Sequence, residues 1–510
     1  MRRPVWRAAI LAVLTVAAAV PRAQGPAAPP YRPTSPIAIV GGLLLDGTGG
    51  PPRYDQTVLI QGERITAVGP SATVKVPPGA QLIDAAGMTV MPGLINSNQH
   101  IQLNPLFPSP AAGLPLEHIK ARWERTWAAQ PHRAFVYLMQ GVTSMRNTSG
   151  PSKRILPVKT AIDRGEIPGP RLFLGGALLM SQASFDHYIV EQRTPPDAVS
   201  FMRDEFAYAV IKDVDKDTDR LVGPEFNYWK LLMSSEKWNG SNDFTDEQLR
   251  FITAKARKHG KKIDVHCGGN NDGLRRMLAF DMDTLEHPFY RHQIIDWDII
   301  EGYVKKGVIV DTLLIQMLSE ARRASDPHRF DETLYAMSLD PAEYRVLLHY
   351  RDRMLANLKK PDQPGMAYYD PETPPDVQSF LSKPGHTPRA ALSLDELTRR
   401  MKTSKENMRR FIKAGAKFSM GTDTGAFLNV QQEDPNAEEL MLMVEMGMTP
   451  LQAIAAGTKN GAEALGLMND LGTLEAGKLA DVIVVAGNPL QDMSAMKRVA
   501  IVVKGGVRYK

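Results

Sequence analysis

The sequence predicts an α/β protein, a TIM-like (β/α)8 barrel with a small β-sandwich domain formed from the N- and C-terminal segments. From about residue 93 to 469, apolar strand-like runs such as RLFLGG, KIDVHCGG and AKFSMGTDTG alternate with helical patterns. This alternation is typical of a parallel sheet whose strands are connected by helices. Short β-type runs bounded by Gly and Pro lie on both sides of this region. The length of 510 residues suits a barrel with an accessory domain.

The accessory domain is predicted from two segments that are far apart in the sequence. Residues 36–92 contain the runs IAIVGGLLLDG, QTVLIQGERITAVG and AQLIDAAGMTVMPG, and residues 470–510 show the same pattern of runs and turns. We therefore expect both ends to complete one β-sandwich around the barrel of residues 93–469. Within that barrel, residues 316–405 are rich in Arg, Tyr, Asp and Pro, and we expect them to form a cap-like insertion beside the barrel mouth.

The first residues have the pattern of a secretion signal. Residues 1–23 carry arginines, an apolar run from Ala8 to Val20 and small residues where a signal peptidase could cut, and a Pro-rich linker follows over 24–35. The apolar run is shorter than the roughly 20 residues that span a bilayer. The alternative, a membrane anchor, is therefore less favoured. We expect an exported protein, periplasmic or secreted.

Composition narrows the classes of function. The hydrophobic share of 43% and the charged share of 23% indicate a packed globule. The net charge of +5 includes four arginines in the segment expected to be removed, which leaves 5 − 4 = +1. A nearly neutral chain has no overall attraction to nucleic acid or anionic lipid. Cys267 is the only cysteine, so no internal disulfide can form.

Metal-competent side chains recur where the apolar runs stop, which in a barrel is the catalytic end. Asn98 and His100 are two residues apart in MPGLINSNQH and would face the same way in a strand. His266 follows in VHCGG, His287 in LEHP, and Asp423 in GTDTG. Imidazole and carboxylate groups suit zinc or a similar divalent ion.

In these motifs the chain resembles the amidohydrolase superfamily, and within it the branch of imidazolonepropionase-like and Xaa-Pro dipeptidase-like enzymes. The resemblance spans nearly everything after the signal, from PIAIVGGLLLDGTG through MPGLINSNQH, QGVTSMRNTSG, VHCGG, LEHP and GTDTG to LGTLEAGKLADVIVVAGNPL, in the order of the family.

The resemblance implies a role for each matching residue. Lys230 matches the lysine whose carboxylated side chain is a metal ligand in these enzymes. His266 and His287 match the histidines that hold the more exposed metal, and His100 matches one that holds the buried metal. Asp423 matches a metal-ligating aspartate that also acts as general base toward the metal-activated water. The implied cofactor is a divalent metal, with zinc favoured.

Asn98 departs from the family, which has a histidine at this place. An amide oxygen is a weaker zinc ligand than an imidazole nitrogen, so the buried position should be loosened. Asn96 and Asn147 also stand where the family usually has aspartate. Three interpretations remain open: one metal held at the exposed position, which we favour; two metals with Asn98 as a weak ligand; or a site that has lost hydrolysis and serves binding or a redirected reaction.

Other residues have plainer interpretations. Lys212 is the rival to Lys230, but Lys230 lies among apolar neighbours in YWKLLM, and burial favours the neutral amine that carboxylation requires. His187 follows a strand-like run and is a candidate for substrate contact, although a solvated loop histidine is equally consistent with its place. Cys267 is more typical of a small core residue than of a ligand.

The sequence thus predicts a metal-dependent hydrolase of a C–N bond in a small amide or dipeptide, with one or two metal ions per chain. A binding protein on a decayed scaffold, or a lyase or isomerase on the same scaffold, is the alternative. We expect neither nucleic-acid binding nor stable insertion into a membrane, and a homo-oligomer is compatible with the sequence.

Overall fold

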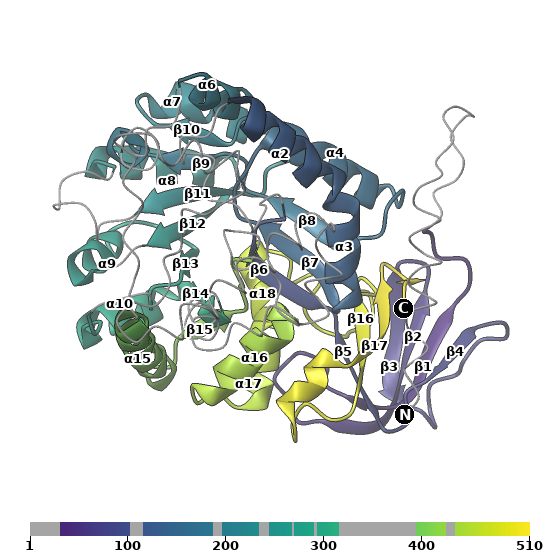
Figure 1. Cartoon of the computed structure of the whole chain (residues 1–510). Coiled ribbons are helices and arrows are strands. Elements are labelled where there is room, and N and C mark those ends of the chain that lie inside the picture. Colours follow the sequence, from purple (N-terminus) through teal and green to yellow (C-terminus); the bar gives the residue numbers. More distant parts are fainter. Residues whose placement is uncertain are drawn as a thin grey trace, which may run out of the picture.

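A ring of parallel strands enclosed by helices forms the larger part of the molecule (Figure 1). The computed structural model describes residues 31–101, 116–186, 196–233, 244–267, 270–289, 293–315, 394–424 and 434–510. The ring consists of β6 (Leu94–Gln99), β7 (Val142–Asn147), β8 (Arg171–Leu174), β9 (Leu178–Met180), β11 (Tyr228–Met233), β12 (Lys262–Cys267), β13 (Thr284–Glu286), β14 (Ile309–Asp311) and β15 (Lys417–Ser419), with β10 (Tyr208–Val210) paired to β9.

Strand ladders connect this ring in two parts. One sheet has the order β6-β7-β8 and the other β10-β9-β11-β12-β13-β14-β15. Separate backbone bonds link the two parts at both junctions: Ser97 N–H donates to the Met420 carbonyl at 2.8 Å, and Asn227 N–H donates to the Leu174 carbonyl at 2.8 Å. The fold is therefore TIM-barrel-like, although in the described residues no continuous strand ladder closes the ring.

Helices follow most strands and lie outside the ring (Figure 1). They are α2 (Leu116–Ala128), α3 (Gln130–Met139), α4 (Ser152–Asp163), α5 (Gln182–Phe185), α6 (Pro196–Asp204), α7 (Val214–Thr218), α8 (Asp246–Lys258), α9 (Asn271–Met277), α10 (Trp297–Lys306), α15 (Leu394–Lys413), α16 (Pro435–Glu445), α17 (Pro450–Ala456) and α18 (Lys459–Leu465), with 3-10 turns η2 (Asp219–Leu221) and η5 (Met493–Lys497).

Local sequence explains where several helices begin. Thr245 and Gln248 exchange side-chain-to-backbone bonds at the start of α8, and Thr449 and Gln452 do the same at the start of α17. This reciprocal capping satisfies N–H groups that have no partner within the helix. The capping boxes therefore fix where these two helices begin beside the ring.

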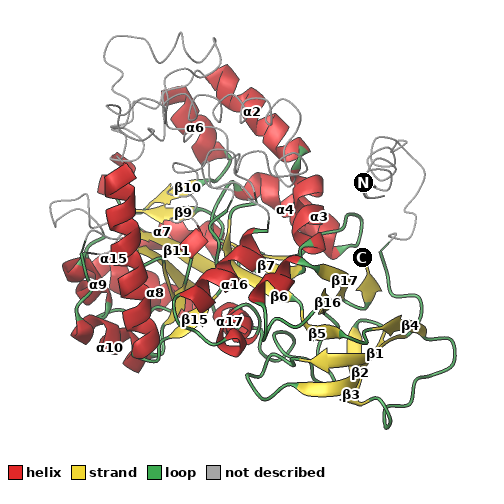
Figure 2. Ribbon diagram, turned by 60° about the horizontal axis from the view of Figure 1, so that its bottom comes forward, coloured by secondary structure: helices red, strands yellow, loops and turns green. Residues whose placement is uncertain are grey.

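The two ends of the sequence meet in one mixed sheet beside the ring (Figure 2). It contains β1 (Ile37–Leu44), β2 (Arg53–Gln61), β3 (Arg64–Pro70), β4 (Gln81–Asp84), β5 (Met88–Pro92), β16 (Val482–Ala486), β17 (Val499–Lys504) and β18 (Val507–Arg508). The predicted pairing of the N- and C-terminal segments is therefore present, because β16 lies antiparallel to β5.

The two-sheet sandwich that we predicted is not confirmed, since all eight of these strands belong to a single hydrogen-bonded sheet. The reason lies in β1, whose first half pairs with β4 and whose second half pairs with β5. Between the halves, Gly41 adopts φ of +76°, a left-handed conformation that glycine adopts at little cost. One strand thus serves both parts of the sheet.

The sheet is also packed against the barrel. Along β16, Val482 and Val484 contribute to the core of the small sheet, whereas Ile483 and Val485 belong to the core that the barrel shares with its helices. Residues that alternate along a strand face opposite sides. The two modules are therefore joined through an apolar layer.

Among the described residues, no helix combines the length and the apolar character needed to cross a bilayer. Of the predicted insertion, residues 316–393 lie outside the described residues, and its last part belongs to α15. Residues 1–30, which include the predicted signal, also lie outside them.

Candidate metal centre

The register of neighbouring strands brings the polar residues of the ring together. His266 on β12, Glu286 on β13, Asp311 on β14 and Ser419 on β15 are paired in register across four adjacent strands. Because paired residues of a parallel sheet point to the same face, these side chains form one polar layer near the carboxyl ends of the strands. Lys230 on β11 is paired in register with Asp264 on β12, which lies two residues before His266 on the same strand.

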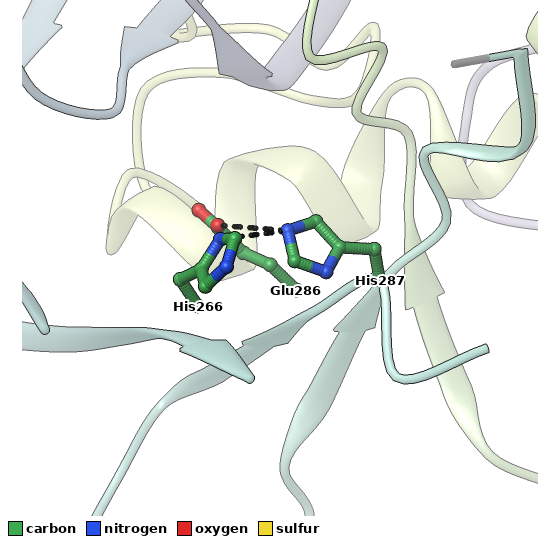
Figure 3. Close-up of side chains that lie close together, drawn as sticks. All are labelled: His266, Glu286 and His287. Carbon is green, nitrogen blue, oxygen red and sulfur yellow. Dashed lines mark hydrogen bonds and ion pairs between the residues drawn. The ribbon is translucent and has the colours of Figure 1, made fainter. Parts of the chain in front are cut away.

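The two predicted histidines are in direct contact (Figure 3). Nε2 of His287 and Nδ1 of His266 are 2.9 Å apart, and the two rings meet nearly edge to face at 80°. His287 directly follows β13 and adopts φ of +33°. A positive φ is uncommon for a residue with a side chain and concentrates at functional sites. The backbone is turned here in a way that aims the imidazole at His266.

Glu286, which the sequence analysis did not single out, completes this group. Its Oε2 lies 3.9 Å from Nε2 of His287. One nitrogen of each histidine and one carboxylate oxygen of Glu286 all lie within 4.8 Å of one another. Glu286 is 1% exposed, and its Oε1 accepts no hydrogen bond within the described residues.

Lys230 is buried, with 3% of its surface exposed, and its amine forms an ion pair with the carboxylate of Glu286. The amine also lies 3.6 Å from Oδ2 of Asp264. Burial lowers the pKa of Lys230, and the nearby carboxylates of Asp264 and Asp423 oppose this. The rival Lys212 is exposed, which removes it from this centre.

Arg146 on β7 is a buried cation that the sequence analysis missed. Its guanidinium, 1% exposed, donates to Oγ1 of Thr284 at 2.9 Å and to Asp264 at 3.0 Å, and also contacts Asp311 and the Ser97 carbonyl. Asp311 receives further bonds from two serines, yet burial still raises its pKa to about 6. This network holds the carboxylates beside Lys230 in place.

Asp423 and His100 form a second pair of predicted site residues. Nε2 of His100 lies 2.9 Å from Oδ1 of Asp423 and 3.1 Å from Oγ1 of Thr148. Asp423 follows β15 and adopts φ of +49°, the same unusual conformation as His287. Its carboxylate is close enough to raise the pKa of Lys230 by its charge. His100, predicted as a ligand of the buried metal, is therefore placed to hold the predicted base.

Asn98 is fully buried on β6, and neither its side-chain nitrogen nor its oxygen has a hydrogen-bond partner within the described residues. Its backbone carbonyl accepts from the N–H groups of Thr422 and Asp423 at 3.0 and 2.9 Å. A buried amide without partners is costly, so a group that binds beside it would gain by bonding to it. The main chain of Asn98 is therefore hydrogen-bonded to the main chain of Asp423, the predicted base.

Asn96 and Asn147, which stand where the family usually has aspartate, both form hydrogen bonds within the protein. The Asn96 amide donates to Gln99, Thr422 and Asn436 at 2.7 to 2.9 Å. The Asn147 oxygen accepts from the Ile101 N–H at 3.0 Å. Both amides therefore tie the ends of strands together. His187 and the side chain of Cys267 lie outside the described residues.

The chemistry of the donor set fits a divalent ion. Zinc ligands at about 2.0–2.1 Å in a tetrahedron lie about 3.3 Å from one another. The 2.9 Å and 3.9 Å separations from Nε2 of His287 to His266 and Glu286 bracket that value. A second acidic group, Asp264, Glu286 and Asp311, also converges. There, however, Arg146 already pairs with Asp264 and Asp311. Lys230 pairs with Oε2 of Glu286, the same oxygen that lies 3.9 Å from Nε2 of His287, so the two groups share this carboxylate.

Comparison with known proteins identifies the family of the chain. The amidohydrolase family profile, described as "Amidohydrolase family", matches residues 89–508. The chain belongs to this family, as the resemblance implied.

Individual relatives cover the chain to different extents. The chain is 33% identical over 115 residues to an imidazolonepropionase of Shouchella clausii (strain KSM-K16), covering 21% of this chain and 26% of that protein. The matched segment thus spans about a quarter of that relative. A molinate hydrolase structure is similar in fold with a TM-score of 0.67 at 22% identity, covering 94% of this chain and 95% of the other. A Xaa-Pro dipeptidase with bound methionine gives a TM-score of 0.63 at 21% identity, covering 93% and 100%.

Proposed function

We propose that this protein is a metal-dependent hydrolase of a C–N bond in a small amide or dipeptide-like substrate. The observation that carries the proposal is the contact between His266 and His287, with Glu286 alongside, near the carboxyl ends of the ring strands. The names of the relatives, an imidazolonepropionase and a Xaa-Pro dipeptidase among them, support a C–N bond as the target.

Each residue of the site has a role in this proposal. His266 and His287 would hold a divalent cation, with zinc favoured, together with the carboxylate of Glu286 or a carboxylated Lys230. When bound, such an ion would supply polarisation of the scissile carbonyl and a lower pKa for water, toward about 7. Asp423 takes the proton of the attacking water and delivers it to the nitrogen as the C–N bond breaks.

His100 and Asn98 position this base. The contact between Nε2 of His100 and Oδ1 of Asp423 fixes one carboxylate oxygen and leaves the other for the water. The Asn98 carbonyl fixes the Asp423 backbone. The Asn98 amide, which has no partner in the part of the chain that the structure describes, is a candidate donor to the substrate carbonyl or carboxylate.

The test is metal analysis combined with a panel of dipeptides and N-acyl amino acids, repeated on Asp423→Asn. We expect chelation to abolish turnover and Asp423→Asn to lower kcat/KM by about 10²- to 10⁴-fold while the metal content is kept. Activity that survives both treatments would refute the mechanism. Metal-free protein with no turnover would favour a binding protein on a decayed scaffold, and a product without added water would favour a lyase or isomerase.

We propose in addition that the protein is exported, because residues 1–23 have the charge and apolar pattern of a signal peptide. Mass spectrometry of the mature protein should find a new N-terminus near Ala23. An intact N-terminus in the cytoplasm would contradict export.

A further inference from the structure

We infer that Leu313, just after β14, is a specificity-determining residue that selects substrates with an apolar side chain next to the scissile C–N bond. This inference rests on the proposed function and names the substrate class of the same site. Leu313 occupies a place in the ring equivalent to the places of His287 and Asp423, two residues of the candidate metal centre.

The strands β13, β14 and β15 are neighbours in the ring (Figure 1), and the same backbone conformation follows each of them. The residues with this positive φ are His287 at +33°, Leu313 at +47° and Asp423 at +49°. Each donates its N–H group to a carbonyl of the next strand or of the residues directly after it; the acceptors are Asp311 at 3.2 Å, Gly421 at 3.2 Å and Asn98 at 2.9 Å. Leu313 is therefore held at the rim of the ring in the same way as two side chains of the candidate metal centre.

The side chain of Leu313 faces the interior of the ring. Asp311, two residues earlier, contacts Arg146 inside the ring. Thr312 points the other way, because its hydroxyl is hydrogen-bonded to Glu439 on the outer helix α16. Since side chains alternate between the two faces of a strand, Leu313 returns to the face of Asp311. It thus lies in the interior, one step closer to the carboxyl ends of the strands.

The immediate neighbours of Leu313 combine an apolar group with an amide. Its Cδ1 lies 3.3 Å from the position that a Cβ on Gly421 would occupy, and Cβ of Asn98 lies 2.8 Å from the same position. Within the described residues, the Asn98 amide forms no hydrogen bond. An apolar wall with a few well-placed polar groups is typical of small-molecule sites. The amide suits a substrate carbonyl or carboxylate, and Leu313 suits an apolar group beside it.

Packing in the main core does not explain why a leucine stands here. That core contains Leu314 and Ile315, which follow, whereas Leu313 is not part of it among the described residues, although it is 0% exposed. A positive φ is an outlier for a bulky side chain, and such strain concentrates at functional sites.

The strained conformation of Leu313 is fixed from outside the ring. The Glu439 carboxylate accepts the N–H groups of Leu314 and Ile315 at 2.8 and 2.7 Å. Glycine would adopt the same φ without strain. The leucine side chain therefore has a use that outweighs the strain, and its place beside the metal centre assigns that use to the substrate.

The test compares Leu313→Ala with Leu314→Ala, a matched truncation of a leucine that lies in the core. Full-length protein loaded with zinc is assayed on Gly-Gly, Leu-Gly and Gly-Leu, which place the apolar side chain on either side of the peptide bond. We expect the wild type to prefer one of the leucine dipeptides to Gly-Gly by at least about 10-fold in kcat/KM, because one methylene in an apolar pocket is worth about 10- to 200-fold. Leu313→Ala should lose about 10-fold or more of this preference. Leu314→Ala should keep the preference, even where its Tm falls.

A measurement that needs no truncation at position 313 guards against a variant that fails to fold. Binding of the same three dipeptides to Asp423→Asn is measured by calorimetry, and the leucine dipeptide that the wild type prefers should bind at least about 10-fold more tightly than Gly-Gly.

The outcomes separate the two proposals. Equal kcat/KM of the wild type for all three dipeptides, or equal loss of preference in Leu313→Ala and Leu314→Ala, would overturn the role of Leu313 and leave the hydrolase proposal intact. Selective binding without turnover by the wild type would overturn the hydrolase proposal but support the apolar contact. Neither turnover nor binding of any of the dipeptides would overturn both.

Discussion

Replacement of Arg146 by methionine should be among the most destabilising single changes in the barrel. The guanidinium is 1% exposed and neutralises Asp264 and Asp311, both fully buried. Removal of one partner from a buried ion pair costs about 3–5 kcal/mol, because it leaves an uncompensated charge. Methionine retains most of the apolar stem, so the loss reports the charge network more than the packing. We expect the free energy of unfolding to fall by at least about 3 kcal/mol.

The assay is urea denaturation followed by tryptophan fluorescence, since Trp229 is fully buried next to Lys230. The control is Lys417→Met, which breaks an ion pair whose side chains are 42% and 38% exposed and should cost less than about 1 kcal/mol. Adding Asp311→Asn to Arg146→Met should recover part of the loss, with a coupling of about 0.5–3 kcal/mol. Equal effects of Arg146→Met and Lys417→Met would refute the reasoning.

Three further predictions concern other parts of the structure. Asn98→His should raise the zinc content of dialysed protein from about one toward two ions per chain, because it restores an imidazole at the buried position; an unchanged metal content by mass spectrometry would contradict this. Burial raises the pKa of Glu439 from 4.5 to about 7, so the free energy of unfolding of the wild type should fall as the pH rises from 4.5 to 7. In Glu439→Gln the free energy of unfolding should not show this fall. The variant should therefore gain up to about 3 kcal/mol relative to wild type between pH 4.5 and 8, and parallel pH profiles in urea melts would disprove it. A methyl group on Gly421 would lie 2.8 Å from Cβ of Asn98, so Gly421→Ala should cost about 1–3 kcal/mol and lower activity. The matched control is Gly69→Ala, whose new methyl group would meet nothing closer than 3.4 Å. This variant should change neither the stability nor the activity.

The sequence was sufficient to predict the TIM-barrel-like ring and the pairing of the N- and C-terminal segments in one module. Alternating strand and helix patterns indicated the barrel-like ring, and paired β-runs at both ends indicated the joint module. The sandwich is not confirmed. Gly41, with its positive φ, lets one strand serve both parts of a single sheet, and this leaves the same alternating pattern in the sequence as two separate strands.

The acidic part of the site was predictable only in part. Asp264 lies two residues before His266 on the same strand and faces the same side, so the alternation rule could have identified it. Glu286 could not be found in this way, because neighbouring strand residues point to opposite faces. His287 follows Glu286 directly and adopts φ of +33°, and the donor atoms of both residues lie near His266, an arrangement that the sequence does not reveal.

The pairing of β5 with β16 has a consequence for how the protein reaches its native state. The Thr89 hydroxyl donates to the carbonyl of Gly487, which lies 398 residues later in the sequence. β5 precedes the whole barrel in the sequence, and β16 follows it. Contacts of such long sequence separation form late, because the intervening loop must first be closed. While the ribosome is still producing the barrel, β5 presents an unpaired edge of Val, Met and Thr, a surface that invites aggregation. High-level expression of this protein should therefore profit from slow synthesis or chaperones that shield that edge until β16 arrives.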